Sequence, residues 1–412
     1  MGHQHHLSQS SYSRMPTQSS LPSWIIPSLA ALVVIAGVAG LWVPDYVGGA
    51  VDFTEYGAAA RVLAQGGNPY DGRSLLAFQT PVGWVDSRAQ MMWNPPWVFP
   101  LVLPLAWLPW GSGFLVWSAI QGAVVVWACV AAWRLYGGAE RQIWVPILMA
   151  FAFAPMLFLM RLGQISGFML FGVVGFLVAM RVGRPGWAGA AMAFTAVKPH
   201  LLLPFAVLLA CDATITPKTR KAVLVGGGLL VACALFPMLC NANVWSQYVE
   251  GTRAPSDEFH YSTADWDPPI LASKLGMYFD NSMAVQFAPS VVATLLLVGY
   301  WFWQRKVWNW EQELPRIVLV SFLTTGYGAW GFDLIVLLLP IIQVATWVAQ
   351  SHNPRLMLWA TLGYLSFNAL ICMALLPVIW WTPVIVLSYL VAWGTKVRVE
   401  KAESVHSAYF PK

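Results

Sequence analysis

The amino-acid sequence predicts an all-α integral membrane protein with about twelve membrane-spanning helices. Of its 412 residues, 58% are hydrophobic and only 10% are charged, whereas a soluble domain carries about 25% charged residues. A chain this long with so few charges cannot cover a water-facing surface, so many apolar side chains must face lipid. Its 24 Trp residues fit this setting, because Trp favours the membrane–water boundary. No basic stretch is interleaved with stacking aromatics, so the net charge of +5 does not indicate a nucleic-acid partner.

The apolar runs give the spans in chain order. A helix needs roughly 20 apolar residues to cross the hydrocarbon core. Residues 1–23 are polar, and we expect a disordered cytoplasmic N-terminus there. The run over 24–43 is too long for a signal peptide and is followed by no cleavage site, so it is predicted as a retained first span. Further clear spans are predicted at 111–134, 143–160, 166–181, 222–240, 284–303, 317–330, 333–350, 356–375 and 378–395.

Two regions remain ambiguous by length alone. Residues 96–110 are apolar but short and rich in proline, and residues 187–210 carry Lys198-Pro199 at their centre. If 96–110 lies at the interface and the chain turns back at Lys198-Pro199, more of the 23 Lys and Arg residues fall on the side of the N-terminus. The positive-inside rule favours that arrangement. We therefore predict a broken hairpin that lines a cavity, since broken backbone at membrane depth is tolerated only there.

This topology defines one polytopic membrane domain over 24–396, with a cytoplasmic tail over 397–412. It leaves two long loops on the non-cytoplasmic side, at 44–94 and 241–283. Loops of this length are usually functional or disordered. Because both contain aromatic residues and helical periodicity, we expect short interfacial helices and a functional site in them.

The first of these loops begins with a short amphipathic pattern. Phe53, Tyr56 and Leu63 recur at helical spacing, which predicts an interfacial helix. Asp52 stands at its start and Glu55 follows three residues later. One interpretation is a helix cap with its capping partner. The other is a general base, and the spacing leaves both open.

Other polar residues fall on the same predicted face. Each has an ordinary structural interpretation, such as a rigid turn or a helix cap. A fixed cation on the outer side can instead hold an anion, and a charged residue at a broken membrane helix is a functional candidate. Taken together, these residues suit transfer of a group from a lipid phosphate: Asp52, Glu55, Asn94, Arg161, Gln164, Lys198, His200 and Asp333.

Metal and redox chemistry find little support in the sequence. The five Cys residues show no metal-ligand spacing. Asp265-Trp266-Asp267 is a weak candidate for a divalent cation, because two carboxylates two residues apart also occur in ordinary loop turns. We expect no required metal or cofactor.

Several short motifs together resemble the glycosyltransferase C superfamily, and within it family 87. These are Asp52-Phe53 with Tyr56 after the first span, Asn68-Pro69-Tyr70, Asn94-Pro95-Pro96, Gly163-Gln164, Lys198-Pro199 and Phe332-Asp333-Leu334. Two departures are Trp93, where Tyr is usual before the proline pair, and the segment before Asp333, which lacks the usual Pro and His or Ser.

The resemblance implies an inverting hexosyltransferase that works without a required metal in the inner membrane of a bacterium. Its donor would be a sugar on a polyprenyl phosphate, most specifically mannose, and its acceptor a lipid or glycan at the non-cytoplasmic face. Asp52 would be the general base. The donor phosphate would be bound by Arg161, Lys198 and His200, and the sugar or acceptor by Glu55, Tyr56, Asn94, Gln164 and Asp333.

A lipid or sugar transporter or flippase is the alternative, since it also needs broken helices and buried charge. Transporters place their sites near the bilayer midplane between repeated halves. The sequence shows no internal repeat, and its polar residues gather at one face. A protein that only binds lipid phosphate would differ from both in showing no turnover.

Overall fold

The computed structural model describes residues 51–255, 257–259, 283–375 and 381–393. The predicted first span at 24–43, the two predicted termini at 1–23 and 397–412, and Asp265 and Asp267 lie outside the described residues.

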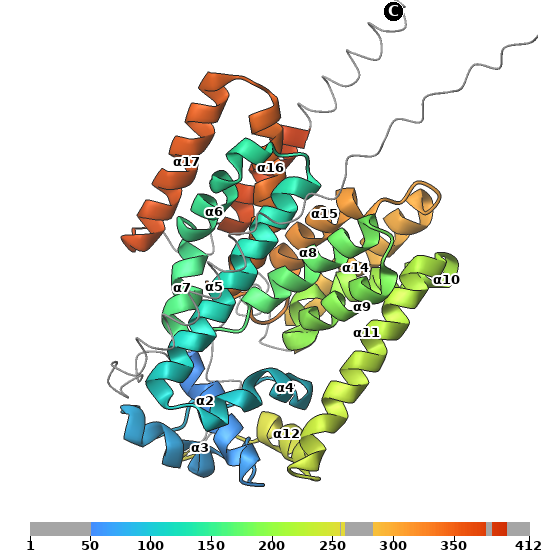
Figure 1. The fold of residues 1–412 in the computed structure, drawn as a ribbon. Helices are drawn as coiled ribbons and strands as arrows, with labels where there is room; N and C mark the ends of the chain where they lie inside the picture. The colour runs from blue at the N-terminus through green and yellow to red at the C-terminus, as the bar shows by residue number, and fades with distance from the viewer. Residues whose placement is uncertain (1–50, 256, 260–282, 376–380, 394–412) are drawn as a thin grey trace, which may run out of the picture.

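Every regular element in the described part of the chain is helical, as predicted. Figure 1 shows the helices as a bundle with shorter helices gathered at one end. The helices are α2 (Val51–Ala64), α3 (Gly72–Gln79), α4 (Phe99–Val102, between 3₁₀ turns Pro96–Val98 and Leu103–Trp107), α5 (Trp110–Leu135), α6 (Trp144–Phe151), α7 (Ala154–Leu162), α8 (Gly167–Arg181), α9 (Pro185–Ala193), α10 (Leu203–Ile215), α11 (Pro217–Leu235), α12 (Val244–Arg253), α14 (Met283–Gln304), α15 (Trp310–Thr324), η9 (Asp333–Leu337), α16 (Leu338–Gln350) and α17 (Pro354–Cys372). A last helix covers Trp381–Trp393.

Five helices in the described residues are long and apolar enough to cross a membrane. They cover Trp110–Leu135, Pro217–Leu239, Ala284–Gln304, Asp333–Gln350 and Pro354–Cys372. Several apolar helices of this kind support the prediction of a membrane protein. The count of about twelve spans stays a prediction.

The span predicted at 143–160 is broken. The helices Glu140–Phe151 and Ala154–Leu162 meet at an angle of 61°. Pro155 stands in the first turn of α7, where a proline costs no helical hydrogen bond. The freed amide of Ala154 donates to the side-chain oxygen of Asn368 at 2.7 Å, so α17 satisfies the backbone at the bend.

The predicted break at Lys198 is confirmed. Lys198 is extended (φ −140°, ψ 77°) between the 3₁₀ turns Phe194–Val197 and Pro199–Leu202, because a residue before proline avoids the helical region. The Asn94 side-chain amide donates to the Val197 carbonyl at 2.9 Å, and the Trp97 indole donates to the Ala196 carbonyl at 2.8 Å. Side chains from another segment therefore satisfy the carbonyls that the break frees, as buried irregular backbone requires.

The two ends of the bundle differ. At one end, α5, α15 and α16 meet, since Tyr136 donates to the Glu311 carbonyl and Gln350 donates to the Tyr136 carbonyl. Helix α8 joins them there, because Arg181 donates to the Leu135 carbonyl. At the other end α2, α3, α4 and α12 lie together (Figure 1). There the proline-rich segment Pro96–Trp107 packs against α2 and against the end of α11. The segments predicted for one membrane face thus share one end of the molecule.

Helix α2 forms where the sequence predicts a short helix after the first span. Phe53, Tyr56 and Leu63 are buried as expected, but Asp52 and Glu55 are buried as well. Asp52 and Glu55 border a cavity, and the position of α2 at the membrane interface stays a prediction.

Close packing of α9 on α11 depends on glycine. A Cβ atom on Gly189 would lie 2.2 Å from the Ala222 carbonyl oxygen, so the two helices would have to separate. We expect Gly189→Ala to destabilise the protein by about 1–3 kcal/mol, the usual cost of overpacking. Thermal unfolding in detergent would measure it. Gly227→Ala is the control, since its Cβ would meet nothing within 4 Å. An equal effect of both substitutions would contradict this account.

Candidate active site

A cavity of about 690 Å³ lies at the α2 end of the bundle. Its walls come from α2, the segment 84–95, the loop after α7, the break at Lys198, α12 and the segment 327–333. Most of the side chains predicted as site residues line it, namely Asp52, Glu55, Tyr56, Asn94, Gln164, Lys198, His200 and Asp333. Residues that are up to 281 positions apart in the chain, Asp52 and Asp333, thereby share one site.

Asp52 lies in the first turn of α2 and is only 8% exposed. Burial raises the pKa of its carboxyl from 3.8 to about 6, and the negative charge of Asp333 acts in the same direction. The positive charge of Lys198 and a hydrogen bond with Gln164 partly offset this increase in pKa. A carboxylate with a pKa near neutrality can take up a proton during a reaction.

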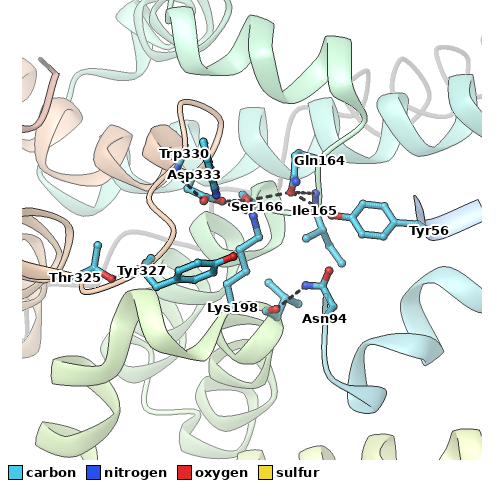
Figure 2. A network of polar contacts seen from close by, with 11 residues as sticks. Tyr56, Asn94, Gln164, Ile165, Ser166, Lys198, Thr325, Tyr327, Trp330 and Asp333 are labelled. Atoms are coloured by element: carbon cyan, nitrogen blue, oxygen red, sulfur yellow. Dashed lines mark hydrogen bonds and ion pairs between the residues drawn. The ribbon is translucent and has the colours of Figure 1, made fainter. Parts of the chain in front are cut away.

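Gln164 is held against α2 by the tight turn after α7. Gly163 has φ +71°, and a Cβ there would lie 2.5 Å from the Cβ of Phe53, so this turn requires glycine. Its carbonyl accepts a hydrogen bond from the Trp117 indole at 2.7 Å. The Gln164 side-chain oxygen then accepts hydrogen bonds from the Tyr56 hydroxyl at 3.2 Å and from the Ile165 amide at 3.0 Å. Figure 2 shows this junction.

Lys198 and Asp333 form a buried ion pair. The Lys198 Nζ lies 2.7 Å from Asp333 Oδ1, and the side chains are 13% and 0% exposed. Asp333 also accepts hydrogen bonds from the Ser166 hydroxyl at 2.5 Å and from the Trp330 amide at 3.1 Å. Both carboxylate oxygens are therefore engaged, which fixes the ammonium group at the cavity wall (Figure 2).

Glu55 and Asn94 face the cavity beside this pair. Glu55 is 3% exposed, and one of its oxygens accepts from the Trp93 amide at 3.3 Å. The Asn94 side-chain amide donates to the Val197 carbonyl of the broken hairpin. The backbone carbonyl of Asn94 accepts a hydrogen bond from the Tyr70 hydroxyl at 3.0 Å. Asn94 thus connects the first loop to the broken hairpin.

His200 carries an open hydrogen-bonding atom. Its Nε2 is buried and has no hydrogen-bond partner among the described residues. The ring packs against Tyr327 with centroids 5.7 Å apart. A buried polar atom without a partner costs free energy, so His200 is suited to bind an oxygen of a ligand in the cavity.

Arg161 does not join the other predicted residues. It is exposed in the last turn of α7 and lies outside the walls of the cavity. The geometry gives no support for its predicted contact with a phosphate.

Sequence reasoning missed one residue behind the cavity wall and two kinds of wall residue. Ser166, which joins Gln164 to Asp333, stands two residues after a predicted residue in the same turn. Tyr327 lies between Gly326 and Gly328 in the segment before η9. Aromatic rings from Trp84, Trp93 and Tyr248 also line the cavity. Two signals were available among these: a tyrosine flanked by glycines between two apolar helices, and Trp93, which directly precedes the predicted Asn94.

Comparison with known proteins decides the family. The family model of glycosyltransferase family 87 matches residues 93–326, more than half of the 412 residues. The chain belongs to glycosyltransferase family 87. No curated protein and no solved structure gives a significant match. For this family 87 member, the matched stretch contains Asn94, Gln164, Lys198 and His200, while Asp52 and Asp333 flank it on either side.

The described residues of this glycosyltransferase contain no group of three or more His, Cys, Asp or Glu side chains that could hold a metal ion. The predicted metal candidate, Asp265 and Asp267, lies outside those residues. The cavity is lined by the buried carboxylate of Asp52, the anchored ammonium of Lys198, the His200 imidazole and aromatic rings.

Proposed function

We propose that this membrane glycosyltransferase moves a hexose, most specifically mannose, from a polyprenyl phosphate to a lipid or glycan acceptor. The reaction takes place at the non-cytoplasmic face of a bacterial inner membrane, with both termini in the cytoplasm. One observation carries the proposal: the buried carboxylate of Asp52 and the anchored ammonium of Lys198 line one cavity. A base and a fixed cation are what a displacement at a phosphate-linked sugar needs.

The carboxylate of Asp52 acts on the acceptor. A sugar or lipid hydroxyl is a poor nucleophile, so its proton passes to Asp52 as its oxygen attacks the anomeric carbon. The bond between that carbon and the phosphate oxygen breaks, and the bonding electrons leave with the lipid phosphate. Attack opposite to the leaving group inverts the configuration of the anomeric carbon. Because burial raises the pKa of Asp52 to about 6, the group is ionised at pH 7 and basic enough to accept the proton.

The ammonium of Lys198 and the open nitrogen of His200 act on the donor. Negative charge accumulates on the departing phosphate, and fixed donors in a partly dry site stabilise that charge. Asp333 has no exposed surface, so its role is to position Lys198 rather than to bind a sugar. Tyr56 acts similarly on Gln164, whose side chain stands between Asp52 and the Ser166–Asp333 pair.

The direct test is sugar transfer by the purified protein. It would be given radiolabelled polyprenyl-phosphate-mannose and a panel of glycolipid and glycan acceptors. Label that appears in an acceptor, with the anomeric configuration inverted, would support the proposal. Transfer from a different polyprenyl-phosphate sugar would replace mannose in the proposal and leave the proposed reaction type unchanged. Movement of intact donor across a liposome membrane without product would instead support a transporter.

A further inference from the structure

Glu55 is a second carboxyl group in the cavity, one helical turn after Asp52. It is 3% exposed and forms no ion pair with any residue that the structure describes. The ammonium that would neutralise it, on Lys198, is bound to Asp333 at 2.7 Å. Glu55 therefore has no dedicated cation among the described residues to stabilise a negative charge.

Charge balance in the cavity points the same way. Asp52 and Asp333 already contribute two negative charges near the ammonium of Lys198. The donor phosphodiester of the proposed reaction would bring a further negative charge. A third ionised carboxylate would repel it, since like charges in a poorly solvated site cannot all ionise.

Two hydrogen-bond donors contact Glu55, but burial outweighs them. Its Oε1 accepts from the Trp93 amide at 3.3 Å, and Gln90 provides a further side-chain hydrogen bond. Burial raises the pKa of Glu55 well above its ordinary value, and the charge of Asp52 raises it further. The Trp93 amide, the charge of Lys198 and the Gln90 hydrogen bond act against that increase.

We propose that Glu55 keeps its proton throughout turnover and donates it in a hydrogen bond to a hydroxyl oxygen of a bound sugar. The proposal rests on the proposed sugar transfer. Sugar rings combine apolar faces with hydroxyl groups, and the cavity offers the matching surface. Its walls include the rings of Trp84, Trp93 and Tyr248 and the neutral amide of Gln90. Aromatic walls with a few placed polar groups are typical of small-molecule sites.

This role divides the two carboxyl groups of α2 by function. Asp52 must lose its proton to act as a base, whereas Glu55 must keep its proton to act as a donor. Enzymes give two neighbouring carboxyl groups different acid and base roles by placing them in environments that favour opposite protonation states. Other titratable groups face the same cavity, and a pH profile reports them too. They are Asp52 and Tyr56 of α2, Asp86, Tyr248 of α12, Lys198 and His200 at the break, and Tyr327 and Asp333, with Tyr70 close to Glu55 behind the wall.

The decisive comparison is between Glu55→Gln and Glu55→Ala. The glutamine amide is a neutral donor of the same shape, so kcat/KM at pH 7 should stay within about threefold of wild type. The alanine variant should lose about tenfold, because a sugar hydroxyl then lacks its partner. At alkaline pH wild type should lose activity as Glu55 ionises, and Glu55→Gln should lack that part of the decline. A purely structural Glu55 would leave the alkaline limb identical in both proteins.

Steady-state kinetics distinguish whether the hydroxyl bound by Glu55 belongs to the donor sugar or to an acceptor sugar. A rise in KM for polyprenyl-phosphate-mannose alone in Glu55→Ala assigns the hydroxyl to the donor sugar. A rise in KM for the acceptor alone assigns it to an acceptor sugar. A Glu55→Gln variant as inactive as Glu55→Ala would overturn the proposal, because it would mean that the ionised carboxylate is required.

Infrared spectroscopy detects a protonated Glu55 carboxyl group directly and does not require turnover. Wild type at pH 7 should show the carbonyl stretch of a protonated carboxyl group, and Glu55→Gln should lack it. An unchanged spectrum would overturn the proposal. A wild type that transfers no sugar would refute the proposed function and the sugar ligand of Glu55, while the infrared band would still decide where the proton resides.

Discussion

Asp52→Asn is expected to abolish sugar transfer and to raise thermal stability at the same time. Loss of a general base typically costs about 10²–10⁴-fold in rate, because an amide cannot accept the proton of the acceptor hydroxyl. The gain in stability follows from burial. A pKa increase from 3.8 to about 6 means that ionised Asp52 destabilises the folded protein at pH 7 by about 3 kcal/mol. Kinetics with the labelled donor and thermal unfolding in detergent measure the two effects.

The sign of the stability effect depends on pH in a defined window. The folded-state pKa of Asp52 lies above its unfolded value, so the destabilisation is complete above about pH 6 and vanishes as pH falls through 3.8. The advantage of Asp52→Asn should therefore shrink between pH 7 and pH 4, and wild-type activity should fall below about pH 6. Glu250→Gln, an exposed carboxyl change on α12, is the control and should alter neither quantity. Normal transfer by Asp52→Asn would eliminate Asp52 as the base.

The parts of the fold that follow from local rules could be predicted from the sequence. The break at Lys198 is one, because Pro199 restricts the residue before it wherever that pair occurs. The bend before α7 could not be predicted. It depends on Asn368, which lies 214 residues away in the chain. The side-chain oxygen of Asn368 accepts a hydrogen bond from the backbone amide of Ala154. A proline in an apolar run does not by itself show whether a neighbouring helix supplies hydrogen-bond partners for the backbone groups that a bend would free.

The site divides in the same way. Charged residues in an apolar chain are costly, so Asp52, Lys198 and Asp333 could be predicted individually. Their pairing could not, because it depends on how α2, the hairpin and η9 pack. Ser166 gave no signal, since one serine is unremarkable and its bond to Asp333 spans 167 positions. Arg161 shows the opposite case. A cation in a short turn can face either way, and the packing of α7 leaves it exposed.

Lys198→Met is expected to have the largest effect on folding and to abolish transfer. It would leave the carboxylate of Asp333, which is 0% exposed, without its cation. Removing one partner of a buried ion pair costs about 3–5 kcal/mol. The exposed pair Arg134 and Glu140 is the matched control, with 27% and 62% exposed side chains. Arg134→Met should cost less than about 1 kcal/mol. Thermal unfolding of the two variants makes the comparison.

The double variant Lys198→Met/Asp333→Asn separates stability from catalysis. The asparagine that replaces Asp333 would be neutral, and its side-chain oxygen could still accept from Ser166 or from the Trp330 amide, so no uncompensated charge would be buried. We expect the double variant to recover most of the stability lost in Lys198→Met, a coupling that a double-mutant cycle measures directly. Transfer should stay abolished, because the ammonium that we propose to stabilise the departing phosphate is still missing. Recovery of both properties would mean that Lys198 only neutralises Asp333, and the phosphate would then have to be bound elsewhere in the protein.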